Sequence, residues 1–311
     1  MWLLLLSVSP LLALRCPSEN PAPLQFHLVR QCQRAATADA LALESTGTLE
    51  ECMALTRELR GLALNFAPGG PGRRTNRFDP QPRELASSRR QKDARNRLSV
   101  FEQPAEYFNC HVLACPQNTS FAGMTNDSRF DYYSLYGRPT ALHNISCVAQ
   151  VGLFVFYTQP ANYLNASTSC SNASEFSGSL AHVASEARTY ALAQWLLNYN
   201  RQRVGEHPEP GILLAYVGLQ FNVSKSLQPL DYRNAQQESL LCFLYRAWHK
   251  GHPRVGGSQA NASCVALTPN GTWQTLSCEH ELPFICEIFT PPRANTNTQL
   301  DTGANAADAC Y

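Results

Sequence analysis

The order and spacing of aromatic, glycine and cysteine residues between residues 216 and 287 restrict the possible folds of this chain more than any other feature. An apolar segment with an internal glycine comes first, and a long stretch without hydrophobic periodicity follows it. Short segments with cysteine and tryptophan then lead to a last apolar segment. In order, these are Tyr216-Val-Gly-Leu219, Trp248, Cys264-Val-Ala-Leu267, Gly271-Thr-Trp273, Cys278 and Pro283-Phe-Ile-Cys-Glu287.

The preceding residues add signals in a fixed order. Val148 to Tyr157 is an apolar run typical of a strand buried on both faces. Tyr163-x-x-Ala166-x-x-x-Cys170 and the stripe that follows Ser185 predict two helices, the second capped by that serine. Ile212 to Leu219 is expected to form a central strand. Residues 147 to 287 therefore resemble a C-type lectin-like domain, in which Ser177-Gly-Ser-Leu-Ala-His-Val183 matches the turn written GGxLAxI.

The resemblance implies an α+β, disulfide-stabilised fold with two helices, two small antiparallel sheets and an irregular loop region from about Gln220 to Ala262. It also implies that Cys170 pairs with Cys286 and that Cys264 pairs with Cys278. Closing the larger loop would contribute about 3–5 kcal/mol by restricting the unfolded chain.

The other cysteines have no assigned partners. Cys147 and Cys242 could pair with each other or with the first half of the chain. Residues 16–115 contain five cysteines, so at least one of them crosses domains, bonds another chain or stays free. Cys310 is a candidate partner and could instead link two chains into a dimer.

Calcium-dependent lectins of this family bind sugar through a loop tripeptide written EPN or QPD and a strand written WND. Here the loop reads His252-Pro253-Arg254 and the strand reads Trp273-Gln274-Thr275. Calcium needs six to eight oxygen ligands, which His252 and Arg254 cannot supply. We therefore expect no calcium, metal or other cofactor at this position, although a cis bond before Pro253 remains plausible.

The residues around this degenerate sugar site are basic, and one interpretation is that they bind a sulfated or sialylated glycan. Their histidines would then strengthen binding at mildly acid pH. An ordinary solvated loop is an equally good interpretation. The candidate ligand-binding residues are Arg246, Trp248, His249, Lys250, His252, Pro253, Arg254, Gln274 and Thr275.

The first half of the chain has its own organisation. Thr48 and Glu51 form a capping-box pattern before an amphipathic helix, and Leu62–Phe66 is expected to be a strand. With Asn109-Cys-His-Val-Leu113 and Phe130-Asp-Tyr-Tyr133, this order resembles a PAN/apple domain over residues 16–137, although such domains usually carry more cysteines around the helix. A basic insertion at about 68–103 is expected to be a disordered linker, which could bind anionic glycan or be cleaved at Arg89-Arg90.

Several features predict secretion. Residues 1–14 resemble a signal peptide, and no later segment is apolar enough to span a membrane. Twelve cysteines fit an oxidising compartment, and a net charge of +1 predicts no attraction to nucleic acid. Eight glycosylation sequons support the same conclusion, at Asn118, Asn126, Asn144, Asn165, Asn172, Asn222, Asn261 and Asn270.

The expected domains are thus a signal peptide at 1–14, a PAN/apple-like domain at 15–137, a C-type lectin-like domain at 138–288 and a flexible tail at 289–311. The leading hypothesis is a secreted recognition glycoprotein that binds an extracellular protein or an anionic glycan without calcium. The alternatives are a disulfide-linked matrix component and a calcium-dependent lectin with non-standard ligands. No Gly-x-Ser-x-Gly, His-Glu-x-x-His or phosphate-binding glycine loop is present, so we do not expect an enzyme.

Overall fold

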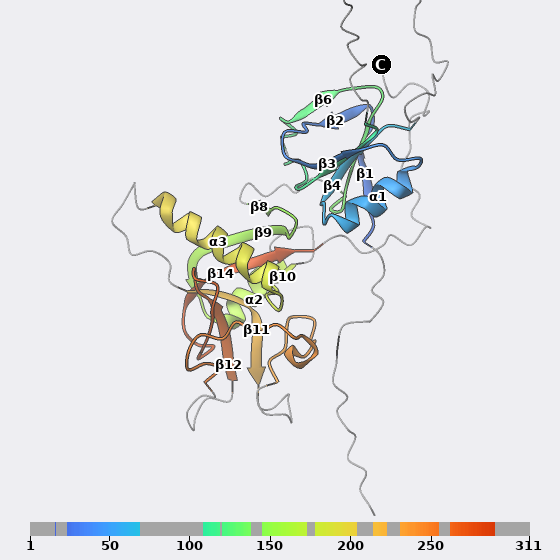
Figure 1. Cartoon of the computed structure of the whole chain (residues 1–311). Helices are drawn as coiled ribbons and strands as arrows, with labels where there is room; N and C mark the ends of the chain where they lie inside the picture. The colour runs from blue at the N-terminus through green and yellow to red at the C-terminus, as the bar shows by residue number, and fades with distance from the viewer. Residues whose placement is uncertain are drawn as a thin grey trace, which may run out of the picture.

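The computed structural model describes the chain in two modules, one on each side of residue 140 (Figure 1). The described residues are 16, 24–68, 108–118, 120–137, 145–172, 178–203, 214–222, 231–254 and 262–289. The expected signal peptide, most of the basic insertion, the C-terminal tail and Cys310 lie outside them. Within the described residues no helix is long and apolar enough to cross a membrane.

The N-terminal module contains a five-stranded antiparallel sheet in the order β1-β7-β4-β5-β3. A separate antiparallel pair, β2 and β6, lies beside it (Figure 1). The elements are β1 (His27–Arg30), β2 (Gln33–Ala35), β3 (Ala40–Glu44), α1 (Leu49–Glu58), β4 (Ala63–Phe66), β5 (Cys110–Leu113), β6 (Met124–Asn126) and β7 (Asp131–Ser134).

Helix α1 begins where the capping-box pattern predicts. The Thr48 side chain accepts a hydrogen bond from the Glu51 backbone N–H at 3.2 Å, and the Glu51 carboxylate accepts one from Gly47 N at 2.7 Å. The first contact satisfies a donor that the first helical turn leaves unpaired, and the second holds the residue before the cap. The helix packs on β4 and β5, and the disulfide Cys52–Cys110 fixes it there.

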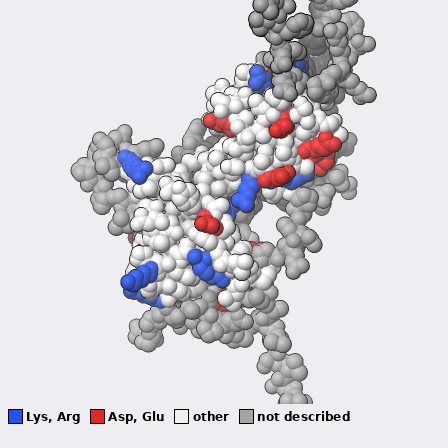
Figure 2. Space-filling model, viewed as in Figure 1, with Lys and Arg blue, Asp and Glu red and all other residues white. Residues whose placement is uncertain are grey.

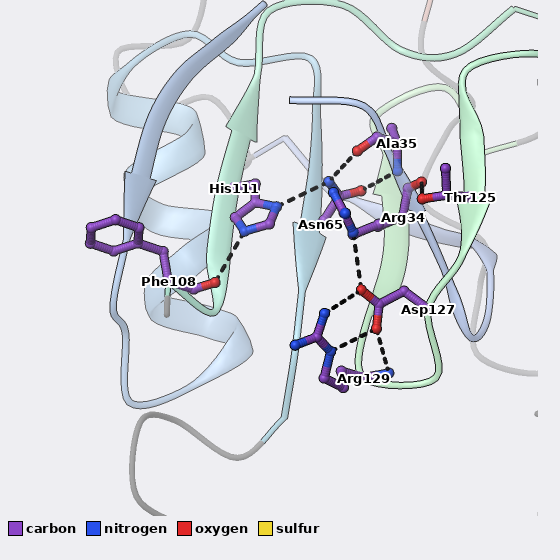
Figure 3. A network of polar contacts seen from close by, with 8 residues as sticks. All are labelled: Arg34, Ala35, Asn65, Phe108, His111, Thr125, Asp127 and Arg129. Atoms are coloured by element: carbon purple, nitrogen blue, oxygen red, sulfur yellow. Dashed lines mark hydrogen bonds and ion pairs between the residues drawn. The ribbon is translucent and has the colours of Figure 1, made fainter. Parts of the chain in front are cut away.

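The sheet also buries a polar network (Figure 3). Asn65 on β4 is fully buried, and its side-chain amide accepts from Ala35 N at 2.9 Å and donates to Ala35 O at 3.0 Å. The same amide nitrogen lies 3.3 Å from Nδ1 of His111, its register partner on β5. Asn65 therefore ties β2 to the main sheet, and both backbone groups of Ala35 have partners.

At the edge of the same network, Asp127 accepts from Arg34 at 3.0 Å and from Arg129 at 2.7 Å (Figure 3). Hydrogen bonds from Arg129 are the main reason why the pKa of the Asp127 carboxyl is lowered to about 2. Burial lowers the pKa of His111, whose Nε2 lies 3.0 Å from Phe108 O. The Nε2 proton is therefore donated to that carbonyl, and Nδ1 accepts from Asn65.

The second module is one seven-stranded sheet in the order β13-β12-β11-β14-β9-β8, with β10 paired to β14. Two helices and one short 3₁₀ helix complete it (Figure 1). The elements are β8 (Ile145–Val148), β9 (Gly152–Ala161), α2 (Tyr163–Asn172), β10 (Gly178–Leu180), α3 (Glu186–Arg203), β11 (Ala215–Asn222), η1 (Leu240–Cys242), β12 (Ala262–Leu267), β13 (Trp273–Leu276) and β14 (Leu282–Ile288).

Three sequence expectations for this module need correction. The two sheets are joined because β14 pairs with β9 on one side and, in parallel, with β11 on the other. The apolar run from Val148 to Tyr157 is a hairpin of β8 and β9, interrupted by a turn in which Gln150 has a φ of 61°. Gln150 is the only polar residue in this turn and Gly152 follows it, and a single polar residue between Ala149 and Val151 was too weak a signal to divide the run. The central strand β11 also begins at Ala215, after Leu214, while Ile212 and Leu213 lie outside the described residues.

The disulfides link the two modules as well as closing each one. Cys170–Cys286 and Cys264–Cys278, which the resemblance implies, are both present. Cys115–Cys147 joins the segment after β5 of the N-terminal module to β8, and Cys16–Cys242 joins the start of the chain to η1. Cys32 is also disulfide-bonded, and no cysteine among the described residues is free.

Direct contacts support the link between the modules. The Tyr136 hydroxyl, buried at the end of the N-terminal module, accepts a hydrogen bond from Leu153 N on β9 at 3.1 Å. Gln150 donates its side-chain amide to Leu59 O at 3.0 Å. A single cluster of buried apolar side chains includes Leu64, Tyr136 and Leu153. The two modules therefore share a packed boundary.

Candidate functional site

The candidate site is the segment 247–254, which covers the free edge of the seven-stranded sheet. Trp273 on the edge strand β13 donates its backbone N–H to Ala247 O at 2.7 Å and accepts from His249 N at 2.9 Å. Uncovered edge strands expose unpaired backbone groups. The segment therefore has a structural role in addition to any role in binding.

His252 continues this cover through its side chain. The backbone N–H of Thr275 donates to His252 Nδ1 at 2.9 Å, and the Thr275 hydroxyl lies 2.8 Å from the same nitrogen. The hydroxyl also accepts from Arg254 N at 2.8 Å. Since a backbone N–H can only donate, Nδ1 is the acceptor and the ring proton is on Nε2. His252 thus takes the place of a carbonyl on a neighbouring strand.

The environment of His252 favours its neutral form. Burial lowers its pKa, and the positive charges of Arg254 and His249 lower it further. Protonation at Nδ1 would place a donor against the Thr275 N–H. These contacts therefore oppose the protonation of His252 at mildly acid pH, and with it the stronger anion binding expected from its positive charge. The bond between His252 and Pro253 is cis, as the resemblance suggested.

Exposed basic residues surround this hydrogen-bonded pair. His249, Lys250 and Arg254 are exposed, and residues 240–254 contain no Asp or Glu. The described residues place no carboxylate within ion-pair distance of Lys250 or Arg254. In the view of Figure 2, basic side chains lie at the lower end of the second module and most acidic ones on the N-terminal module. The site can therefore offer positive charge to an anion.

Arg246, also expected to bind ligand, instead donates hydrogen bonds to backbone carbonyls of its own chain. Its guanidinium donates to Leu240 O at 2.6 Å, Phe243 O at 2.6 Å and Tyr245 O at 2.7 Å. Partial burial also lowers its pKa. The sequence does not show which backbone carbonyls an arginine will contact. In a segment rich in basic residues, Arg246 was therefore grouped with the candidate ligand-binding residues.

Trp248 and Gln274 complete the candidate residues. Trp248 is half-buried, and its ring packs at right angles to that of Trp273, with centroids 5.4 Å apart. Gln274 is half-buried on β13, opposite Ala266. The Trp248 ring therefore packs the segment 247–254 against the buried Trp273. Thr272, which sequence reasoning missed, lies 3.3 Å from His249 Nδ1 through its hydroxyl.

The resemblance aligns His252 and Thr275 with two calcium-ligand positions of sugar-binding family members, and here these two residues bond each other directly. Neither side chain offers a carboxylate or amide oxygen to a calcium ion. Among the described residues no group of three or more His, Cys, Asp or Glu side chains could hold a metal ion.

The sequons differ in accessibility. Asn222 is half-buried at the end of β11, while Asn144 and Asn261 lie outside the described residues. The others are exposed, at Asn118, Asn126, Asn165, Asn172 and Asn270. Glycosylation at these five positions is compatible with the fold.

Comparison with known protein families identifies residues 159–288 by the model of the Lectin C-type domain. The match does not extend to the N-terminal module, so the PAN/apple resemblance has no support from it. A comparison with curated proteins gave no match.

Among solved structures, human lithostathine is 20% identical over 48% of this chain and 98% of its own, with a TM-score of 0.35. The carbohydrate-recognition domain of mouse scavenger receptor C-type lectin is 17% identical over 49% of this chain and 99% of its own, with a TM-score of 0.37. Ovocleidin-17, a major protein of the Gallus gallus eggshell calcified layer, is 21% identical over 48% and 98%, with a TM-score of 0.35. The family match, rather than these structures, identifies a C-type lectin domain at residues 159–288.

Proposed function

We propose that this chain is a secreted recognition glycoprotein whose C-type lectin domain binds its ligand without calcium. The observation that carries the proposal is the hydrogen-bonded pair of His252 and Thr275, which occupies two ligand positions of calcium-binding relatives. A neutral imidazole that accepts from a backbone N–H has no lone pair on that nitrogen left for an ion. Ligand binding then depends on the side chains that remain exposed.

The exposed cations favour an anionic ligand. Lys250 and Arg254 lie within five residues of each other and have no ion-pair partner among the described residues. Sulfate and carboxylate groups form charge-assisted hydrogen bonds with such side chains, and an arginine can hold two oxygens at once. Sulfated or sialylated glycan is thus the first ligand class to test at this site, with an acidic protein surface as the other.

Secretion and the N-terminal module belong to the same proposal. The apolar start of the chain, the eight sequons and the disulfides support an extracellular protein. The N-terminal module has a helix packed across an antiparallel sheet, which supports the PAN/apple resemblance as a proposal. The N-terminal module, which two disulfides link to the lectin domain, could add a contact surface for the same partner.

The test is binding of the purified secreted protein to an array of neutral, sialylated and sulfated glycans, with and without EDTA. We expect binding to sulfated glycans that is insensitive to EDTA and weakens as salt rises. The double variant Lys250→Ala/Arg254→Ala should reduce this binding at least tenfold. Arg201→Ala, which removes an exposed arginine from α3, is the matched control and should bind like the wild type.

EDTA-sensitive binding to neutral sugars would contradict the proposal and would favour a calcium-dependent lectin with non-standard ligands. Covalent dimers on a non-reducing gel, without glycan binding, would instead favour a disulfide-linked matrix component. Absence of all glycan binding would leave an acidic protein surface as the ligand class of Lys250 and Arg254. A protein ligand that the double variant still binds would show that these residues are not the site.

A further inference from the structure

A short loop upstream of the segment 247–254 presents leucine side chains to solvent. In residues 240–246, here called the apolar loop, Leu244 has a relative exposure of 103% and Leu241 one of 48%. Single exposed leucines are common on protein surfaces. Two in one seven-residue loop, one of them fully exposed, form a more specific feature.

The apolar loop is anchored at several points. Leu240 is buried and donates its N–H to Tyr232 O at 2.7 Å, and the Ser239 hydroxyl accepts from Leu241 N at 3.1 Å. The Arg246 guanidinium holds three of the loop's carbonyls, and Cys242 is bonded to Cys16.

The other large side chains of the loop face the protein. The Phe243 ring lies 5.2 Å from His182, and the Tyr245 ring lies 5.6 Å from the buried Trp273, between centroids. Leu241 and Leu244 are the ones left outside. The backbone is therefore fixed in a form that presents these two leucines, and a partner would lose little loop entropy on binding.

The charges near the apolar loop restrict the chemistry of a partner. Of the five basic residues in 240–254, His249, Lys250 and Arg254 are exposed, and the segment contains no acidic residue. Just upstream, Asp231 is paired with Arg233 at 2.7 Å, and Glu238 accepts from Asn234 at 2.7 Å. Tyr245 and Trp248 both pack on Trp273, so the apolar loop and the segment 247–254 contact the same buried residue. A complementary surface would be apolar with carboxylates beside it.

We infer that Leu241 and Leu244 form a docking site for a segment of a partner protein that carries apolar side chains flanked by Asp or Glu. Its anchors, Leu241 and Leu244, are not part of the glycan site proposed at Lys250 and Arg254, although the same two basic side chains would face the partner's carboxylates. Leu244 would be the anchor, since a fully exposed side chain gains most by burial in a recess of the partner.

A lipid surface matches this chemistry less well. Basic side chains assist membrane binding where anionic lipids are abundant, which is the cytoplasmic leaflet. A protein that is secreted meets the opposite leaflet, where two leucines would have little electrostatic help. The rigid backbone also suits a shaped protein recess better than a fluid surface.

The test uses a phage library of disulfide-constrained random peptides, selected on the full-length secreted protein. Selected peptides should combine apolar residues with Asp or Glu, and Leu244→Asp should weaken their binding at least tenfold. Leu244→Lys removes the same apolar contact but adds a charge that attracts carboxylates, so it should weaken binding less than Leu244→Asp. Leu164→Asp is the matched control, because Leu164 is 73% exposed on α2, and it should change nothing.

Each outcome supports or overturns the docking site. Since Leu244 is fully exposed, its variants should be secreted and unfold like the wild type, and they should keep any binding to sulfated glycans. Selection of no peptide that depends on Leu244, or equal losses with Leu164→Asp, would overturn the inference. Leu244-dependent sedimentation with phosphatidylcholine or phosphatidylserine vesicles, without peptide binding, would show a lipid-binding loop and overturn it too.

Discussion

The two modules bury large side chains of their sheets by different means. The N-terminal module places Asn65 and His111 side by side on adjacent strands and satisfies them with hydrogen bonds (Figure 3). The second module, here called the lectin module, buries Trp273 on its edge strand β13, with Tyr245 and Trp248 packed around the ring and one hydrogen bond from the indole to Thr189. Stability should therefore depend on polar satisfaction in one module and mainly on packing in the other.

The largest expected effect comes from the lectin module. Trp273→Ala should lower the free energy of unfolding by about 3–5 kcal/mol, because it leaves a cavity under two aromatic rings. Chemical denaturation of the disulfide-intact protein, followed by far-UV circular dichroism, measures it. Trp195→Ala removes a half-buried tryptophan from α3 and should have a smaller effect. Equal effects of the two substitutions would contradict the central role of Trp273.

A smaller effect is expected in the N-terminal module. Asn65→Ala should lower the free energy of unfolding by about 1–3 kcal/mol, because the buried N–H and C=O of Ala35 lose their partner. The same denaturation experiment measures it. Gln33→Ala, which removes an exposed hydrogen bond to Asn126, is the control and should change stability by less than about 0.5 kcal/mol. If the control destabilised the protein as much as Asn65→Ala, the buried network would not be what holds β2 to the sheet.

The smallest expected effect is on pH dependence, and it involves both modules. Burial lowers the pKa of His182 from 6.5 to about 4 in the lectin module and lowers that of His111 in the N-terminal module. The unfolded chain then binds more protons than the folded one below pH 6.5, so stability falls as the pH falls through this range. At pH 5.5 the loss from His182 should be on the order of 1 kcal/mol.

Thermal unfolding at pH 7.5 and 5.5 tests this expectation. His182→Gln and His111→Gln should each reduce the loss on acidification. A loss that is unchanged in both variants would assign the pH dependence to other groups. A change in only one of them would show which module limits the stability of the whole chain in acid.

Much of the local structure could be predicted from the sequence. The capping box located the start of α1, and the apolar stripe after Ser185 located α3. The hairpin of β8 and β9 was missed, because Gln150 and Gly152 are the only interruptions of an otherwise apolar run. The use of Arg246 was also hidden, since its three acceptors are backbone carbonyls that any residue would supply.

The disulfides show the same division. The resemblance implied two pairs within the lectin domain, and the count of cysteines required at least one bond out of residues 16–115. Only the structure shows that Cys16 reaches Cys242 over a separation of 226 residues and that Cys115 reaches Cys147. Connectivity depends on which cysteines the fold brings together, and spacing does not encode that.

At the candidate site, residue identity alone predicts that the side chains of His252 and Arg254 cannot supply the hard oxygen ligands of calcium, because side-chain chemistry does not depend on the fold. What these residues do instead depends on the tertiary fold. His252 and Thr275 are 23 residues apart and meet because the segment 247–254 covers the edge of β13. Likewise, the sequence showed leucines in residues 240–246, but their exposure depends on which side chains the core accepts. Composition thus sets which interactions are available, and packing selects among them.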